Sequence, residues 1–157
     1  MADLVYLSQE RLLELEKELK ELKTEGRRKM AETIAEARAQ GDLSENAEYD
    51  AAKDAQGLME LKISKMEDML RRARVIDTSS MPHDEVHILS KITVTNLKVN
   101  KTFTYTLVSP EEANLKEGKI AISSPVGKAF MGKKEGDIVA ANVPAGIIKF
   151  KIDKIHT

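Results

Sequence analysis

One stretch decides the fold: Ala39-Gln-Gly-Asp-Leu-Ser-Glu-Asn-Ala-Glu-Tyr-Asp-Ala-Ala-Lys53, which separates two long segments of helical periodicity in this 157-residue chain. Gly41 suits the position just past a helix C-terminus, where φ is often positive. Asp42 suits the N-cap of the second helix, and Glu45, three residues further on, completes a capping box. We therefore predict an antiparallel helical hairpin with a very short turn, which places Asp42 and Glu45 at its tip.

The two tip acids have two interpretations. Capping alone would account for them, because negative charge in the first turn stabilises a helix by about 0.3–1 kcal/mol. However, Glu48 and Asp50 follow at once, so four carboxylates crowd one helix start, and Leu43 is apolar in an exposed turn. Two carboxylates at this spacing can share Mg²⁺, but Mg²⁺ needs six oxygen ligands, so a partner would have to complete the site. A hairpin with these acids at its tip would deliver carboxylates to a two-metal centre of another protein.

A heptad-like pattern predicts the two arms of the hairpin. The first helix is expected from Gln9 to Gln40, with Ser8 as its N-cap and a local bend at Gly26. The second follows Asp42. The expected seam positions are Leu12, Leu15, Leu19, Leu22, Gly26, Met30, Ile34 and Ala37 in the first arm, and Ala52, Ala55, Met59, Ile63, Met66, Leu70 and Ala73 in the second.

Composition narrows the class of protein. The sequence has no cysteine, which excludes a disulfide framework and thiolate metal sites. Its three histidines are scattered through the second half, and its net charge of −1 does not indicate a nucleic-acid binder by bulk charge. It shows no signal peptide and no apolar run of the ~20 residues that a membrane span requires. We therefore expect a cytoplasmic monomer that does not contact a membrane.

In the second half of the chain, the spacing of apolar residues changes from the helical period to a period of two, which predicts a separate domain. Residues 77–85 form a polar stretch with a proline and are predicted to be a linker between a hairpin of residues 1–76 and a domain of residues 86–157. Alternation with period two then predicts strands, and Ser124-Pro125 begins a short helix that ends before Gly132. The expected fold class is α+β: a coiled-coil hairpin followed by a small antiparallel sheet with one short helix.

Two sets of motifs carry a family resemblance. Residues 41–49, Gly-Asp-Leu-Ser-Glu-Asn-Ala-Glu-Tyr, resemble the signature of the GreA/GreB family of bacterial transcript cleavage factors. Residues 122–133, with Gly-Asp at 136–137 and Pro-Ala-Gly at 144–146, resemble the C-terminal domain of the same family. The resemblance follows the order of the chain and covers nearly all of it.

The resemblance implies a function in transcription elongation. The hairpin would enter the secondary channel of RNA polymerase, and the C-terminal domain, which is similar to an FKBP-like fold, would dock at the channel mouth. Asp42 and Glu45 would help to bind the second catalytic Mg²⁺, which is held jointly with the polymerase. The polymerase would then cleave the 3′ end of backtracked nascent RNA and rescue the arrested complex. The protein itself would not be the enzyme.

The same resemblance implies roles for further residues. Leu43, Ser44, Asn46, Glu48 and Tyr49 would support the tip. Arg38 and Lys53 flank it and would face the extruded RNA. The ammonium group of Lys53 is a point charge, whereas an arginine would offer a planar guanidinium that can bond two oxygens. Ser124, Pro125 and Gly127, at the start of the short helix, would dock on the polymerase.

Three alternatives belong to other classes. An FKBP-like sheet suggests a prolyl isomerase or chaperone, although fold does not determine function. The proline-binding pocket of such an isomerase would have to be built from the aromatic residues of this domain, Phe103, Tyr105, Phe130 and Phe150. A polymerase inhibitor of the same architecture would block the channel without aiding cleavage, but the tip retains both acids. A plain coiled-coil adaptor would explain the seam and leave the acidic tip unexplained.

Overall fold

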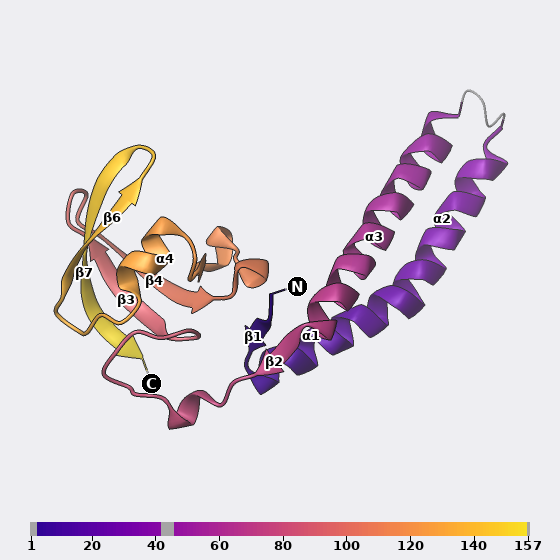
Figure 1. Ribbon diagram of the computed structural model, residues 1–157. Coiled ribbons are helices and arrows are strands. Elements are labelled where there is room, and N and C mark those ends of the chain that lie inside the picture. The colour runs from indigo at the N-terminus through magenta and orange to yellow at the C-terminus, as the bar shows by residue number, and fades with distance from the viewer. Residues whose placement is uncertain (1–2, 42–45, 157) are drawn as a thin grey trace. The chain divides into compact units, whose positions relative to one another are not determined.

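The computed structural model describes residues 3–41 and 46–156 (Figure 1). It divides into two compact units, one formed by Glu10–Arg72 and the other by Met1–Gln9 together with Ala73–Thr157. The hairpin and the sheet expected from the sequence are therefore both present, as an α+β chain. The predictions for Asp42, Leu43, Ser44 and Glu45 fall outside the described residues.

The helical unit contains two antiparallel arms that lie side by side (Figure 1). The first arm is α1 (Gln9–Glu21), a π-helical turn η1 (Leu22–Gly26) and α2 (Arg27–Ala39); the second is α3 (Ala47–Arg71). Gly26, where the sequence predicted a local bend, is the last residue of this π-helical turn. There the Thr24 hydroxyl donates a hydrogen bond of 2.8 Å to the Lys20 carbonyl, which competes with the regular backbone ladder.

The seam of the hairpin follows the predicted heptads with two corrections, both in the second arm. Every predicted position of the first arm is buried or half-buried, with Leu15 and Ala37 the most enclosed. In α3 the prediction is wrong at Ala55, which is exposed, whereas Gln56 is half-buried. It is also wrong at Ala73, because α3 ends at Arg71 and Ala73 begins a short strand. The seam of α3 keeps strict three-four spacing through position 56, and the apolar character of Ala55 obscured this in the sequence.

Ion pairs between the arms border the seam. Arg27 pairs with Glu60 at 3.0 Å, Lys62 with Glu18 at 3.2 Å, and Lys23 with Glu67 at 3.4 Å. All six side chains are exposed, so each pair contributes about 0.2–1 kcal/mol. Their main effect is to favour the antiparallel register of the two arms.

The second unit is built on a five-stranded sheet with the order β5-β4-β3-β7-β6. Its strands are β3 (Lys91–Asn96), β4 (Lys101–Val108), β5 (Lys119–Ala121), β6 (Ile138–Val143) and β7 (Gly146–His156). The expectation of a wholly antiparallel sheet needs correction, because β4 and β5 pair in parallel. Between them the chain crosses back through two 3₁₀ turns, η3 (Pro110–Glu112) and η4 (Leu115–Glu117), as parallel neighbours require.

One short helix covers the core of this sheet. As predicted, α4 (Pro125–Phe130) has Ser124 as its N-cap, whose hydroxyl accepts a 3.0 Å hydrogen bond from the Gly127 amide. Gly132 follows with a φ of +77°. Phe130 is fully buried and meets Phe150 edge to face, with 5.3 Å between ring centroids.

A two-stranded parallel sheet ties the start of the chain to the second unit. β1 (Val5–Leu7) pairs with β2 (Ala73–Val75), and neither strand was predicted. The Tyr6 amide donates a 2.9 Å hydrogen bond to the Ser109 hydroxyl, which precedes η3 and makes no capping bond to it. Residues 1–9 and 73–76 therefore group with the sheet, whereas the sequence placed them in the hairpin segment 1–76.

Candidate functional site at the end of the hairpin

Asn46 connects the ends of the two arms. Its side-chain amide donates to the Ala37 carbonyl near the end of α2, and its Oδ1 accepts a 3.0 Å hydrogen bond from the Tyr49 amide in the first turn of α3. Asn46 is thus the N-cap of α3, and the predicted N-cap, Asp42, is wrong. One side chain satisfies an otherwise unpaired donor of α3 and holds α2 beside it.

Gly41 has the predicted role on the other side of the turn. α2 ends at Ala39, Gln40 is its C-cap, and Gly41 follows with a φ of +142°, a conformation that L side chains rarely adopt. Residues 42–45 therefore lie in sequence between two well-defined helix ends: Gly41 follows the C-cap of α2, and Asn46 is the N-cap of α3.

Tyr49 and Arg38 form a second contact between the arms. The Arg38 guanidinium lies over the Tyr49 ring at 5.7 Å from its centroid, while Tyr49 is half-buried and Arg38 is exposed. A cation–π contact of this kind contributes about 0.5–1 kcal/mol at an exposed site. It also fixes a positive charge next to the four-residue tip, so Arg38 and Tyr49, both predicted site residues, act together.

The remaining predicted residues near the tip are exposed. Glu48 and Asp50 project from the first turn of α3, and the Lys53 ammonium donates a 2.9 Å hydrogen bond to the Gln56 side chain. Within residues 3–41 and 46–156 there is no group of three or more His, Cys, Asp or Glu that could hold a metal ion. The described part of the hairpin end therefore offers a frame with flanking positive charges and no complete metal site.

The distal part of the hairpin is slender. Exposed alanines occupy outer positions on both arms near the tip, namely Ala31, Ala35 and Ala39 in α2 and Ala47, Ala51 and Ala55 in α3. Alanine is the best helix former, so these positions keep the arms stiff with minimal side-chain bulk. A stiff, narrow helix pair is suited to entering a confined space.

The predicted docking residues of the second unit have different environments. Pro125 is exposed, and Ser124 is half-buried with its hydroxyl engaged in capping. Gly127 is buried, because a Cβ at this position would lie 2.0 Å from the Ala121 carbonyl oxygen. Gly127 can therefore shape a docking surface by letting α4 approach β5, but it offers no side chain to a partner.

An apolar hollow of about 500 Å³ lies beside the start of α4. Its lining includes the stacked rings of Phe103 and Tyr105, 5.7 Å apart and almost parallel, with Ile120, Val126 and Phe150. Burial raises the pKa of the Tyr105 hydroxyl, so the side chain remains neutral and can donate a hydrogen bond. Alternation in β4 indicated that Phe103 and Tyr105 share a face; only the return of α4 and β5 turns that face into a hollow.

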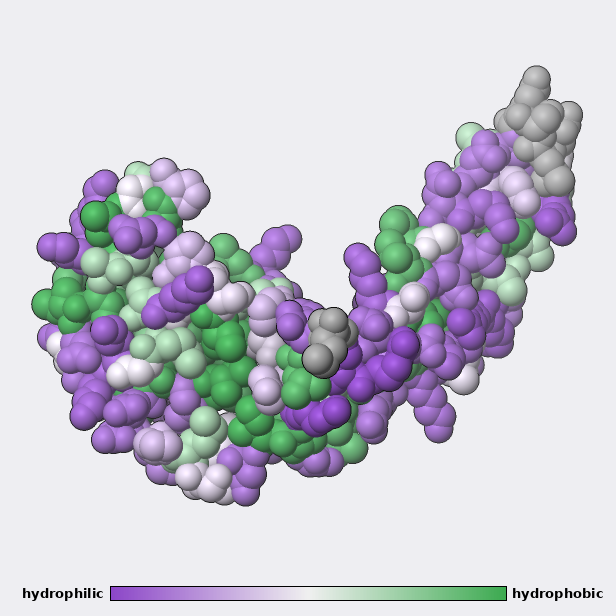
Figure 2. Space-filling view, viewed as in Figure 1, coloured by the Kyte–Doolittle hydropathy of each residue, from purple (hydrophilic) through white to green (hydrophobic). Residues whose placement is uncertain are grey.

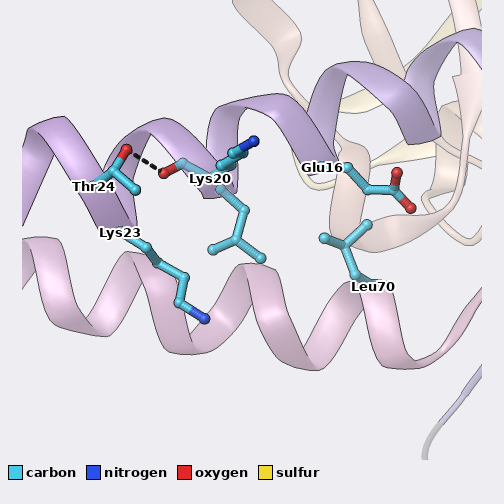
Figure 3. Close-up of a pocket in the computed structure, with 6 residues that line it drawn as sticks. Glu16, Lys20, Lys23, Thr24 and Leu70 are labelled. Atoms are coloured by element: carbon cyan, nitrogen blue, oxygen red, sulfur yellow. Dashed lines mark hydrogen bonds between the residues drawn. The ribbon is translucent and has the colours of Figure 1, made fainter.

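A second opening of about 350 Å³ lies in the hairpin, beside the π-helical turn (Figure 3). Leu70 reaches from α3 toward the first arm there, and Glu16, Lys20 and Lys23 border the gap. The widened backbone of η1 loosens the contact between the arms at this point. We interpret the opening as incomplete packing of the seam, since the seam residues Leu19 and Leu70 line it together with polar and charged side chains.

Comparisons with known proteins assign the chain to a family. Residues 5–75 match the model described as Transcription elongation factor, N-terminal, and residues 81–157 match Transcription elongation factor, GreA/GreB, C-term. Both matches describe transcription elongation factors, and this is the class of protein that the hairpin and the sheet unit form. The chain belongs to the GreA/GreB family.

Relatives agree with this assignment over their whole length. The chain is 51% identical to Transcription elongation factor GreA of Amoebophilus asiaticus, with 97% of each chain covered. It is 47% identical to the protein of the same name from Thermoanaerobacter pseudethanolicus, with 99% of each covered. Among solved structures, GreA factor homolog 1 of Thermus thermophilus is 27% identical, with a TM-score of 0.43, over 98% of this chain and 99% of that one.

Within the described residues, no helix is long and apolar enough to cross a membrane.

Proposed function

We propose that this transcription elongation factor inserts its hairpin into the secondary channel of RNA polymerase and stimulates the polymerase to cleave backtracked nascent RNA near its 3′ end. The observation that carries the proposal is the frame at the hairpin end. Asn46 joins α2 to α3, and Arg38 stacks on Tyr49 across the same two arms. A frame of this kind on both sides of residues 42–45 suits the delivery of acids into another active site.

Asp42 and Glu45 are the residues that would hold Mg²⁺ in this proposal. The donor set fits, because carboxylate oxygens are the ligands that Mg²⁺ prefers and two of them leave positions for water and for the partner's ligands. The described residues contain no cluster that could complete the site within this chain. With such an ion bound, the shared two-metal centre would supply an activated water and charge stabilisation for the leaving oxygen. The factor contributes ligands, and the polymerase remains the enzyme.

Arg38 and Lys53 would orient the RNA. Both are exposed and both flank the tip, one on each arm. Arg38 is the more constrained, because its guanidinium is held over the Tyr49 ring, whereas Lys53 is a mobile point charge that bonds a neutral amide. We infer that Arg38 fixes the position of a phosphate near the tip and that Lys53 adds longer-range attraction.

The second unit would anchor the factor on the polymerase. The apolar hollow beside α4 offers aromatic surface, and the exposed Pro125 lines a separate opening beside the same helix. An apolar cavity with a few polar groups is the kind of surface on which a partner's side chain can be seated. Anchoring raises the effective concentration of the tip at the channel, so the tip itself needs little affinity. We expect the factor to act as a monomer.

The deciding experiment uses a polymerase that is stalled and backtracked on end-labelled RNA. Adding the full-length protein should release a short 3′ fragment and allow the complex to resume elongation when nucleotides are supplied. Binding without cleavage would instead indicate a channel-blocking inhibitor. A protein that neither binds the polymerase nor changes the RNA would overturn the proposed function.

A further inference from the structure

Gly57 occupies a position where the described part of the protein does not require glycine. It lies in the interior of α3, is exposed, and has a helical φ, and a Cβ built on it would meet nothing within 4 Å. Gly26 differs, because a Cβ there would touch the Met59 sulfur at 3.4 Å. Glycine is among the poorest helix formers, so Gly57 weakens α3 with no packing gain in the free chain.

Two exposed leucines adjoin this glycine. Leu58 is 70% exposed and Leu61 is 51% exposed, and both are large apolar side chains on a helix otherwise rich in charge. At 100° per residue, Gly57, Leu58 and Leu61 lie on one side of α3, away from the seam residues Met59 and Ile63. Figure 2 shows hydrophobic surface at the free edge of α3, partway along the hairpin. We call Gly57, Leu58 and Leu61 the Gly57 patch.

The size of the patch indicates what can cover it. A stable dimer or an independent partner needs about 800 Å² and roughly 20–30 residues on each side, far more than three residues provide. A contact this small affects binding only when other surfaces of the same chain already hold the partner, because effective concentration then replaces affinity. The occupant is therefore the partner that receives the rest of the hairpin, and a second copy of the chain does not fit this role.

The patch lies on the same arm as the frame at Asn46. Exposed Ala47, Ala51 and Ala55 keep the stretch of α3 between them free of bulky side chains on one flank. Gly57 is about 15 Å from the first residue of α3, at ~1.5 Å per residue, so a channel that encloses the tip reaches it. Absence of a Cβ lets an approaching segment come close to the helix backbone, as close helix contacts require.

We propose that the Gly57 patch is a second contact with RNA polymerase, in which an apolar segment of the channel wall packs on the α3 backbone at Gly57, beside Leu58 and Leu61. This inference rests on the function proposed above and adds the face of the hairpin that touches protein. It predicts that stability and function oppose each other at Gly57. A methyl group there improves the free helix and obstructs the bound one.

The test compares full-length variants in two measurements, thermal unfolding of the free protein and the concentration giving half-maximal binding to polymerase. Gly57→Ala should raise the melting temperature yet weaken binding by about tenfold. Leu58→Ala with Leu61→Ala should weaken binding by a similar factor. Thr33→Ala, an exposed site on the other arm that also gains helix propensity, should raise the melting temperature and leave binding unchanged.

Wild-type binding of Gly57→Ala, or a lower melting temperature for this variant, would overturn the patch assignment. So would sedimentation showing a dimer that Gly57→Ala abolishes, since the patch would then be a self-contact. These results are separable from the proposed function. If the wild-type protein binds polymerase without promoting cleavage, the proposed function fails while the patch is still judged by binding. If the wild type does not bind polymerase, both fail.

Discussion

The Asn46 side chain spans the two arms of the hairpin, donating to the carbonyl of Ala37 on one arm and accepting from the amide of Tyr49 on the other. An asparagine can do both because its amide carries a donor and an acceptor on one planar group. Aspartate would keep the capping acceptor and lose the donor. Alanine would lose both. The two substitutions therefore separate the cap of α3 from the connection between the arms.

Asn46→Asp should fold nearly as well as the wild type, since aspartate caps a helix about equally well, but it should lower cleavage stimulation because the carboxylate cannot bond the Ala37 carbonyl. Asn46→Ala should also lose about 0.5–2 kcal/mol of hairpin stability. Helicity during thermal unfolding and cleavage of backtracked RNA provide the two measurements. A wild-type cleavage rate for Asn46→Asp would show that the connection between the arms does not position the tip.

Asp42→Asn and Glu45→Gln should abolish cleavage stimulation while leaving binding to polymerase nearly intact. Since the cap of α3 is Asn46, neither substitution removes the cap, and unfolding should not change. A neutral amide is a poorer ligand for Mg²⁺ than a carboxylate, so raising the Mg²⁺ concentration should restore part of the rate. The measurement is cleavage across a Mg²⁺ titration. Wild-type rates at low Mg²⁺ would remove both acids from the mechanism.

Gly127→Ala should destabilise the second unit, because the new methyl group would lie 2.0 Å from the Ala121 carbonyl oxygen and force α4 away from β5. Overpacking of this kind costs roughly 1–3 kcal/mol. Lys128→Ala, at an exposed position of the same helix, is the control and should unfold like the wild type. Hydrogen exchange of the β4 and β5 amides would report the change; unaltered protection in Gly127→Ala would contradict the prediction.

Ser109→Ala should loosen the start of the chain. Ser109 is only 1% exposed and its hydroxyl accepts from the amide of the half-buried Tyr6, so loss of the hydroxyl leaves this donor without its partner. Such a loss costs about 1–3 kcal/mol. Exchange of the Tyr6 amide should accelerate, whereas the exposed Ser123→Ala leaves it unchanged. Equal exchange rates in the two variants would mean that strand pairing alone protects Tyr6.

Local patterns in the sequence determined much of this protein. Three-four spacing of apolar residues predicted both arms, because a helix repeats every 3.6 residues and buries one stripe. Period-two alternation predicted β3 and β4, and Ser124 with Pro125 predicted the start of α4. In each case the residues that specify the element lie within a few positions of one another, so no distant partner is needed.

Tertiary structure decided the rest. The parallel pairing of β4 with β5 and of β1 with β2 depends on which strands meet after long connections, which local periodicity does not encode. Serine is a residue type that often caps helices, yet the Ser109 hydroxyl accepts a hydrogen bond from the Tyr6 amide, 103 positions away. Asp42 and Asn46 are both acceptable caps by residue type, and Asn46, which caps α3, also bonds Ala37 on the opposite arm. A hydrogen bond that needs two separate segments is settled only when the fold brings them together.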